Sequence, residues 1–162
     1  MKILFVDDEP FYMSRHVNAV KAAFQNYTVD QKDNIDDAIE YVEVQSLPTT
    51  DEHDTGSDII VAKVPLQAII LDIMMPKPSR YIKDIDGVKL KDNMNTGVWF
   101  LYYLRQDIRD RNIKVIVLTN NTRDFPAIQA QVRKLELPRA SCYLKRECPP
   151  DVLVQKLREF GL

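Results

Sequence analysis

Residues 2–9 read KILFVDDE, a continuous apolar run that ends directly in three acids. A run without polar alternation is typical of a strand that is buried on both faces of a parallel sheet. Similar short runs recur along the chain, and stretches with helical apolar spacing separate them. They predict further strands at 27–29, 68–71, 114–118 and 141–144. This alternation predicts an α/β fold with a single parallel sheet.

The stretches between the strands predict helices because apolar residues recur there at three- and four-residue intervals. The predicted helices cover residues 11–24, 35–47, 98–108, 126–137 and 150–160. The second has the clearest beginning, since Asn34 stands at its N-cap position. Asp36 and Asp37 follow in its first turn, where acids suit the positive end of the helix dipole.

Two segments fit neither pattern and are predicted to be insertions, at about 46–64 and 77–96 of a single domain that spans residues 1–162. The first contains the polar stretch TTDEHDTGS at 49–57. The apolar run IIVAKV at 59–64 either adds an edge strand or packs over the sheet. The second insertion contains an Asp86-Gly87 turn signal and is expected to form a small hairpin or an ordered excursion.

Composition limits the classes of function. The chain has 162 residues, 45% of them apolar and 28% charged, with a formal net charge of −2. The chain therefore has no excess of positive charge, and we expect no direct contact with nucleic acid. No apolar run approaches the roughly 18 residues of a membrane span, and the N-terminus lacks a signal peptide. We therefore expect a cytoplasmic protein with no membrane contact, whose two cysteines are reduced structural thiols.

Polar residues follow the predicted strands at the points where the strands end. Asp7 and Asp8 follow the first strand, Asp72 the third, Thr119 the fourth and Lys145 the fifth. Because the carboxyl ends of parallel strands gather at one edge of a doubly wound sheet, these side chains are expected to converge. The sequence thus predicts a cluster of carboxylates with one hydroxyl and one ammonium.

Such a cluster predicts a bound cation, because packed carboxylates repel one another. Mg²⁺, or Mn²⁺ in its place, is the natural candidate, since hard divalent ions prefer oxygen ligands. A carboxylate can also attack phosphorus and form an aspartyl phosphate, while the metal and a lysine neutralise charge on the transferred group. All the residue types of the cluster have a role in that one reaction.

Four motifs resemble the strand ends of the receiver (response-regulator) domains of two-component signalling. They are VDDEP at 6–10, LDIMMP at 71–76, VIVLTN at 115–120 and YLKRE at 143–147. The resemblance covers nearly the whole chain apart from the two insertions. It implies a flavodoxin-like, doubly wound (βα)5 fold with a five-stranded parallel sheet of order 2-1-3-4-5.

The resemblance also implies a role for each site residue. Asp72 would be the phosphoacceptor, and Asp7 and Asp8 would hold the cation together with Asp72 and the backbone carbonyl of Met74. Thr119 would be the switch hydroxyl, and Lys145 would pair with the phosphoryl group.

The chain departs from the family pattern around its fifth strand. The family lysine is usually followed by a cis proline, whereas Arg146 follows Lys145 here. An ungapped alignment through the last helix would put Arg146 in the place of the lysine, so both residues stay open as the phosphate-pairing cation. Tyr143 is expected to be the switch aromatic, and Asn120 stands where a small residue is common.

These observations predict a phosphoacceptor domain that a histidine kinase or a histidine phosphotransfer protein phosphorylates. We expect no enzymatic activity beyond its own phosphorylation and dephosphorylation. Since no residues follow 162 to form an output module, output is expected through a conformational change and binding of a downstream protein. The expected binding face comprises the helix at 126–137, the strand at 141–144 and the last helix, and a homodimer through this face stays open.

The alternative function is a phosphorylation-independent, receiver-like adaptor, or pseudo-receiver, which the residues Asn120 and Arg146 favour. A phosphatase or phosphotransferase with an aspartyl intermediate fits less well. Such hydrolases use a second aspartate two residues after the first as acid and base, and LDIMMP lacks it.

Overall fold

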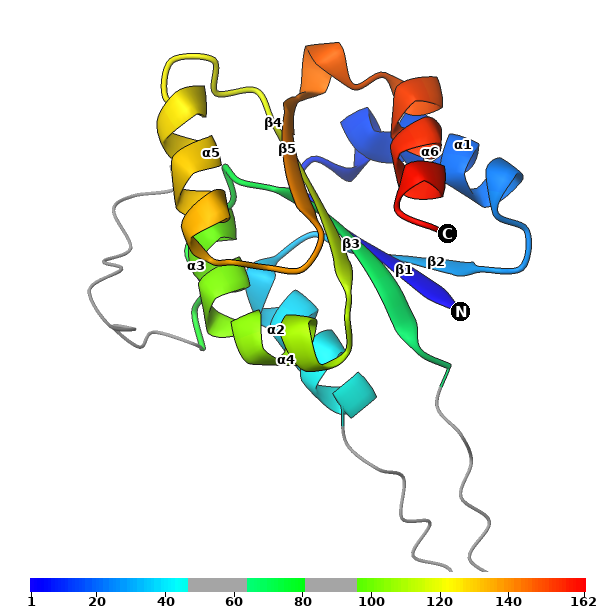
Figure 1. Ribbon diagram of the computed structural model, residues 1–162, viewed down its shortest axis with the longest axis horizontal. Helices are drawn as coiled ribbons and strands as arrows, with labels where there is room; N and C mark the ends of the chain where they lie inside the picture. Colours follow the sequence, from blue (N-terminus) through cyan, green and yellow to red (C-terminus); the bar gives the residue numbers. More distant parts are fainter. Residues whose placement is uncertain (47–63, 81–95) are drawn as a thin grey trace, which may run out of the picture.

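The computed structural model describes residues 1–46, 64–80 and 96–162. Five parallel strands form one sheet with the order β2-β1-β3-β4-β5 (Figure 1). The strands are β1 (Lys2–Val6), β2 (Thr28–Lys32), β3 (Leu66–Asp72), β4 (Lys114–Thr119) and β5 (Ala140–Leu144). The predicted fold class and strand order are confirmed.

Helices cover both faces of the sheet. They are α1 (Pro10–Ala23), α2 (Ile35–Ser46), α3 (Thr96–Tyr103), α4 (Arg105–Asp110), α5 (Phe125–Lys134) and α6 (Pro150–Glu159). A short 3₁₀ turn, η2 (Lys145–Glu147), joins β5 to α6. Helices α1 and α6 lie side by side on one face, and α2, α3 and α5 lie on the other (Figure 1).

Two apolar cores result, because alternate side chains of each strand point to opposite faces. The α1/α6 core includes Ile3, Phe5, Val17, Val20, Leu118 and Leu153. The α2/α3/α5 core includes Leu4, Val6, Ile39, Trp99, Val117 and Val132. The predicted burial of the first strand on both faces is confirmed, since Ile3 to Val6 are at most 1% exposed.

Several predicted boundaries differ from the structure; α5, for example, ends at Lys134 rather than at 137. The second strand covers Thr28–Lys32 rather than 27–29. It is an edge strand in which only Val29 is buried. Its five residues all pair with β1, but few of them are apolar, so the apolar pattern marks only part of the strand. The single helix predicted at 98–108 is divided at Leu104, whose backbone (φ −94°, ψ 9°) leaves helical geometry between α3 and α4.

The beginning of α2 is as predicted. The Asn34 side chain accepts a hydrogen bond from the Asp37 amide at 2.8 Å, which is the geometry of an N-cap. The polar stretch at 49–57, residues 59–63 of the following apolar run and the Asp86-Gly87 turn lie outside the described residues. Among the described helices, none is long and apolar enough to cross a membrane.

Candidate functional site

Three carboxylates meet at the carboxyl edge of the sheet. Strand β1 ends at Val6 and pairs with β3 so that Val6 lies opposite Leu71, and the next residues of the two strands are Asp7 and Asp72. Oxygens of Asp7, Asp8 and Asp72 all lie within 4.8 Å of one another. The Asp7 and Asp72 side chains are only 4% and 7% exposed. The parallel register thus brings together the acids that the sequence placed at strand ends.

Lys145 joins two of these carboxylates. Its Nζ donates to Asp7 Oδ2 at 2.8 Å and to Asp72 Oδ2 at 2.7 Å, and its side chain is 11% exposed. The Arg146 side chain is 71% exposed and lies 3.8 Å from Glu147. Of the two cations that the sequence left open, the structure therefore places Lys145 at the acids. The peptide bond after Lys145 is trans, since the described residues contain no cis peptide.

The loops that follow the strands orient the two carboxylates. The second oxygen of Asp7 accepts a hydrogen bond from the Glu9 amide at 2.8 Å. The second oxygen of Asp72 accepts one from the Met74 amide at 3.1 Å. Each carboxylate therefore has one oxygen on Lys145 and the other on its own loop, which fixes its plane. The expected binding of a cation by the Met74 carbonyl stays a prediction.

The charges of the site are unbalanced. Burial raises the pKa of Asp7 against the opposing effect of Lys145. Burial also raises the pKa of Asp8, and repulsion from Asp72 and Glu9 adds to it. Burial lowers the pKa of Lys145, but the attraction of Asp72 and Asp7 outweighs it, so the pKa lies above its ordinary value. Three carboxylates thus face one ammonium that keeps its charge.

This donor set fits a hard divalent cation. Three carboxylates that can reach a common point supply oxygen ligands only, and their excess negative charge would be relieved by a bound ion. Asp7, Asp8 and Asp72 would hold it. Mg²⁺ suits such a site because it keeps several waters and needs few carboxylates from the protein.

Thr119 ends β4, which pairs with β3 so that Asp72 lies opposite Leu118. The threonine is fully buried, and its Oγ1 accepts a hydrogen bond from the Asn121 amide at 3.1 Å. Next to it, the exposed Asn120 lines an open hollow of ≈ 460 Å³. The other residues that line this hollow are Glu9, Tyr12, Met13, His16 and Lys145. The hollow leaves the Lys145 side of the site open to solvent.

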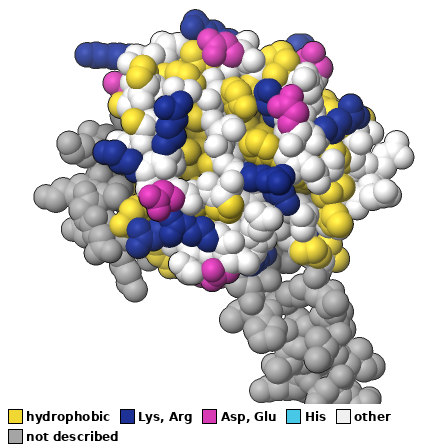
Figure 2. Space-filling view, in the orientation of Figure 1, with side chains coloured by type: hydrophobic (Ala, Val, Ile, Leu, Met, Phe, Trp, Pro, Cys, Tyr) yellow, Lys and Arg dark blue, Asp and Glu magenta, His cyan; other side chains and the backbone are white. Residues whose placement is uncertain are grey.

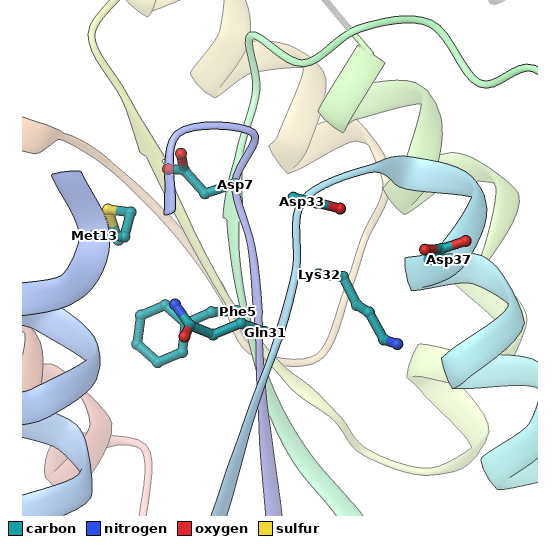
Figure 3. Close-up of a pocket in the computed structure, with 7 residues that line it drawn as sticks. All are labelled: Phe5, Asp7, Met13, Gln31, Lys32, Asp33 and Asp37. Atoms are coloured by element: carbon teal, nitrogen blue, oxygen red, sulfur yellow. The ribbon is translucent and has the colours of Figure 1, made fainter. Parts of the chain in front are cut away.

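A second hollow, of ≈ 250 Å³, lies between the ends of β1 and β2 and the beginning of α2 (Figure 3). It is lined by Phe5, Asp7, Met13, Gln31, Lys32, Asp33 and Asp37. Figure 3 shows the Lys32 side chain directed toward α2 and away from Asp7. The ammonium that is hydrogen-bonded to Asp7 is that of Lys145.

The loop after Asp72 is fastened to α2 by a contact that the sequence did not reveal. The buried carboxylate of Asp36 accepts hydrogen bonds from the Ser79 amide at 2.7 Å, the Ser79 hydroxyl at 2.8 Å and the Arg80 amide at 2.9 Å. The Arg80 guanidinium pairs with Asp37 and Glu40 on the same helix. Asp36 thus holds this loop in addition to its favourable interaction with the dipole of α2. The sequence around Asp36 does not indicate a hydrogen-bond partner 43 residues away.

Gly97 is a second residue that sequence reasoning missed. Its amide donates to the Ile73 carbonyl at 3.0 Å, so α3 begins directly against the end of β3. A Cβ atom at position 97 would lie 2.5 Å from the Asp72 backbone oxygen and 2.8 Å from the Ile73 Cα. The absence of a side chain at Gly97 therefore permits the observed position of Asp72.

The expected coupling of Tyr143 to Thr119 does not fit the structure. Tyr143 packs against the α1/α6 core, whereas Cys142 and Val117 pack in the α2/α3/α5 core. Thr119 is two residues from Val117 in β4 and so shares its face. The strand alternation thus places Cys142 on the Thr119 side and Tyr143 on the other. Burial raises the pKa of Cys142 to about 12, so its thiol is neutral.

Comparison with solved structures identifies the fold. The isolated receiver domain of RcsB from Salmonella enterica serovar Typhimurium, in the presence of the phosphomimetic BeF3⁻, is 18% identical, with a TM-score of 0.57 over 98% of this chain and 88% of that one. The signal receiver domain of a DNA-binding response regulator from Colwellia psychrerythraea 34H is 16% identical, with a TM-score of 0.59 over 98% of this chain and 96% of that one. A CheY-like receiver domain protein from Methanospirillum hungatei JF-1 is 16% identical, with a TM-score of 0.59 over 98% and 90% of the two chains.

No protein-family model and no curated protein sequence matches the chain. The structural similarity nevertheless extends over nearly the whole chain. The chain therefore has the fold of response-regulator receiver domains, as its four strand-end motifs predicted.

Proposed function

We propose that this chain is the phosphoacceptor domain of a two-component phosphorelay and accepts a phosphoryl group on Asp72. The observation that carries the proposal is the position of the Asp72 carboxylate. It lies 2.7 Å from the Lys145 ammonium, within 4.8 Å of oxygens of Asp7 and Asp8, and one strand from Thr119. A nucleophile, two sources of positive charge and a hydroxyl are what phosphoryl transfer to a carboxylate requires.

In the proposed reaction, a carboxylate oxygen of Asp72 forms a bond to phosphorus while the bond from phosphorus to the donor breaks. Lys145 is placed to neutralise charge on the phosphoryl oxygens. A divalent cation, when bound to Asp7, Asp8 and Asp72, supplies further charge neutralisation. The Thr119 hydroxyl accepts from Asn121 and keeps its own hydrogen to donate to a phosphoryl oxygen, which would signal phosphorylation to β4.

The proposed phosphodonor is a histidine kinase or a histidine phosphotransfer protein. Phe11 and Tyr12 at the beginning of α1 are 85% and 71% exposed, and Tyr12 lines the hollow beside Lys145. Exposed aromatic side chains of this kind favour protein contact. Free thiols at Cys142 and Cys148 fit a reducing compartment, and we place the reaction in the cytoplasm.

We propose that output passes through the face formed by α5, β5 and α6. Cationic, acidic and apolar side chains are interspersed on this side of the molecule (Figure 2). Such a mixed surface suits a protein partner better than nucleic acid, in keeping with the net charge of −2. A homodimer through the same face stays a prediction.

Intact mass after incubation with acetyl phosphate tests the proposal. We expect a gain of one phosphoryl group with Mg²⁺ and no gain in a chelator. Asp72→Asn should show no gain under either condition, because its amide is not a nucleophile toward phosphorus. If the wild-type chain binds Mg²⁺ but forms no adduct with acetyl phosphate or phosphoramidate, the phosphorylation-independent adaptor becomes the better account.

Asp8→Asn is expected to stabilise the metal-free protein and to abolish stabilisation by Mg²⁺. Burial and the repulsion from Asp72 and Glu9 raise the pKa of Asp8 above 3.8, so the folded chain binds this proton more tightly than the unfolded chain. The free energy of unfolding of the metal-free wild type therefore falls as pH rises from 3.8 through the folded pKa, and the variant lacks this loss.

Urea unfolding at neutral pH, in a chelator and with Mg²⁺, measures both effects. The wild type should gain stability with the logarithm of Mg²⁺ concentration, as a ligand of the folded state requires. Glu9→Gln is the matched control, since it removes a neighbouring acid that is not one of the three clustered carboxylates. Equal stabilisation of the wild type and Asp8→Asn by Mg²⁺ would exclude Asp8 as a ligand.

A further inference from the structure

The position of the Lys145 ammonium depends on a turn at the edge of the sheet. Lys145 begins η2, directly after β5, and among the described strands β5 pairs with β4 alone. Residues Ala140 to Tyr143 of β5 are only partly buried. Since an edge strand is held on one side only, something beyond the strand must fix the backbone from which Lys145 reaches Asp7 and Asp72.

Cys148 closes the turn and anchors it. Its amide donates to the Lys145 carbonyl at 3.3 Å, which completes the 3₁₀ turn. Its side chain is fully buried in the α1/α6 core. Its own carbonyl accepts a hydrogen bond from His16 Nε2 at 2.9 Å, across 132 residues of sequence. One residue therefore links the Lys145 backbone to the core and to helix α1.

His16 provides the hydrogen bond from outside the turn. Because a carbonyl oxygen can only accept, the hydrogen must be on Nε2. Nδ1 is buried, and it has no hydrogen-bond partner among the described residues. Among the described residues, the Cys148 carbonyl is thus the one hydrogen-bond partner of the ring. The ring also lines the hollow that Lys145 and Asn120 line.

We propose that His16 is a positioning residue for the phosphorylation of Asp72. From α1 it holds the Cys148 carbonyl, and through the closed turn it sets the Lys145 ammonium against Asp7 and Asp72. This inference rests on the proposed function, because it assigns His16 an effect on that reaction. His16 itself does not touch the phosphoryl group.

Three substitutions in the full chain separate positioning from general stability. His16→Leu removes the donor and keeps a side chain of comparable bulk at this half-buried position of α1. His16→Gln restores a donor, since the glutamine Nε2 lies the same number of bonds from the backbone as the histidine Nε2. Val20→Ala is the matched control, because Val20 is a fully buried residue of the same helix and packs in the α1/α6 core that also holds Cys148.

The first measurement is the rate of labelling by acetyl phosphate with Mg²⁺. We expect His16→Leu to be labelled roughly 10-fold more slowly than the wild type, as displacement of a catalytic group by a fraction of an ångström can cause. His16→Gln should recover most of the rate, and Val20→Ala should lower the urea midpoint without slowing labelling. Wild-type rates for His16→Leu, or equal rates for the leucine and glutamine variants, would overturn the proposal.

The second measurement does not need phosphorylation. In ¹⁵N NMR spectra of the wild type, the His16 ring should show the tautomer with hydrogen on Nε2. The amide signals from Lys145 to Cys148 should shift in His16→Leu, return in His16→Gln and stay in place in Val20→Ala. If the wild type is never labelled, the proposed function fails, and these spectra still decide whether His16 holds the turn. Unshifted signals in His16→Leu would refute that contact.

Discussion

Lys145→Met is expected to lower the free energy of unfolding of the metal-free protein by about 3 kcal/mol, because removal of one partner leaves buried charges uncompensated. The lysine is hydrogen-bonded to two carboxylates that are almost fully buried. Without it, Asp7 and Asp72 would repel each other and Asp8. Methionine keeps the length and apolar character of the stem, so the loss is that of the charge.

Mg²⁺ should restore much of this stability, and the stabilisation by Mg²⁺ should be larger in Lys145→Met than in the wild type. The reason is that the bound ion then relieves carboxylates that no ammonium opposes. Labelling of Asp72 by acetyl phosphate should nevertheless fall by about 10²-fold, the usual result of removing a group that neutralises developing charge. Urea unfolding with and without Mg²⁺ and intact mass against time measure these effects.

Lys156→Met is the matched control for this substitution. Lys156 pairs with Glu159 at 2.8 Å, the same distance that separates Lys145 from Asp7, but on the surface of α6. Exposed pairs contribute little because water screens them, so this variant should keep wild-type stability and labelling. Should Lys145→Met lose no more stability than Lys156→Met, the buried charges would not depend on Lys145.

The part of the site that the sequence predicts consists of residues at the ends of strands or directly after them. Asp7, Asp72, Thr119 and Lys145 each follow an apolar run, so parallel topology alone brings them to one edge. This inference needs only the strand ends and the strand order. The inference does not depend on how any helix packs. The wrong boundary of β2 and the division of the predicted helix at Leu104 therefore do not affect it.

The residues that position these groups could not be predicted in the same way. His16, Asp36 and Gly97 act through contacts between a helix and a loop, and such contacts have no period along the chain. Each residue also has a plain local role, within a helix or at its beginning, that accounts for it without a distant partner. Tyr143, expected to be the switch aromatic, lies on the opposite face from Thr119, because strand alternation reverses with a shift of one residue.

Gly97→Ala is expected to lower the free energy of unfolding by about 3 kcal/mol, a large cost for one methyl group but typical of overpacking against rigid atoms. The new Cβ would lie 2.5 Å from the Asp72 carbonyl oxygen and 2.8 Å from the Ile73 Cα. Both are backbone atoms, of the last residue of β3 and of the residue after it, so no side-chain rotation can relieve the contact. Either α3 moves outward or the end of β3 moves, and the Gly97 hydrogen bond to Ile73 is strained in both cases.

Gly161→Ala is the matched control, since its Cβ would meet no atom closer than 3.6 Å. Its cost, about 1 kcal/mol, comes from the positive φ of 84° alone, because an alanine is disfavoured there. Urea unfolding should therefore separate the two alanine variants clearly. Labelling by acetyl phosphate should be slowed in Gly97→Ala and unchanged in Gly161→Ala.

The two losses in Gly97→Ala should have a single origin, since the atoms that the methyl group meets belong to Asp72, the proposed phosphoacceptor, and to its neighbour Ile73. A displaced Asp72 backbone moves the carboxylate away from Lys145, and the 2.7 Å hydrogen bond between them cannot persist unchanged. Stability and labelling should therefore fall together in this variant. If Gly97→Ala lost stability but was labelled at the wild-type rate, the strain would have been absorbed by α3, and the close approach at Gly97 would serve packing rather than the position of Asp72.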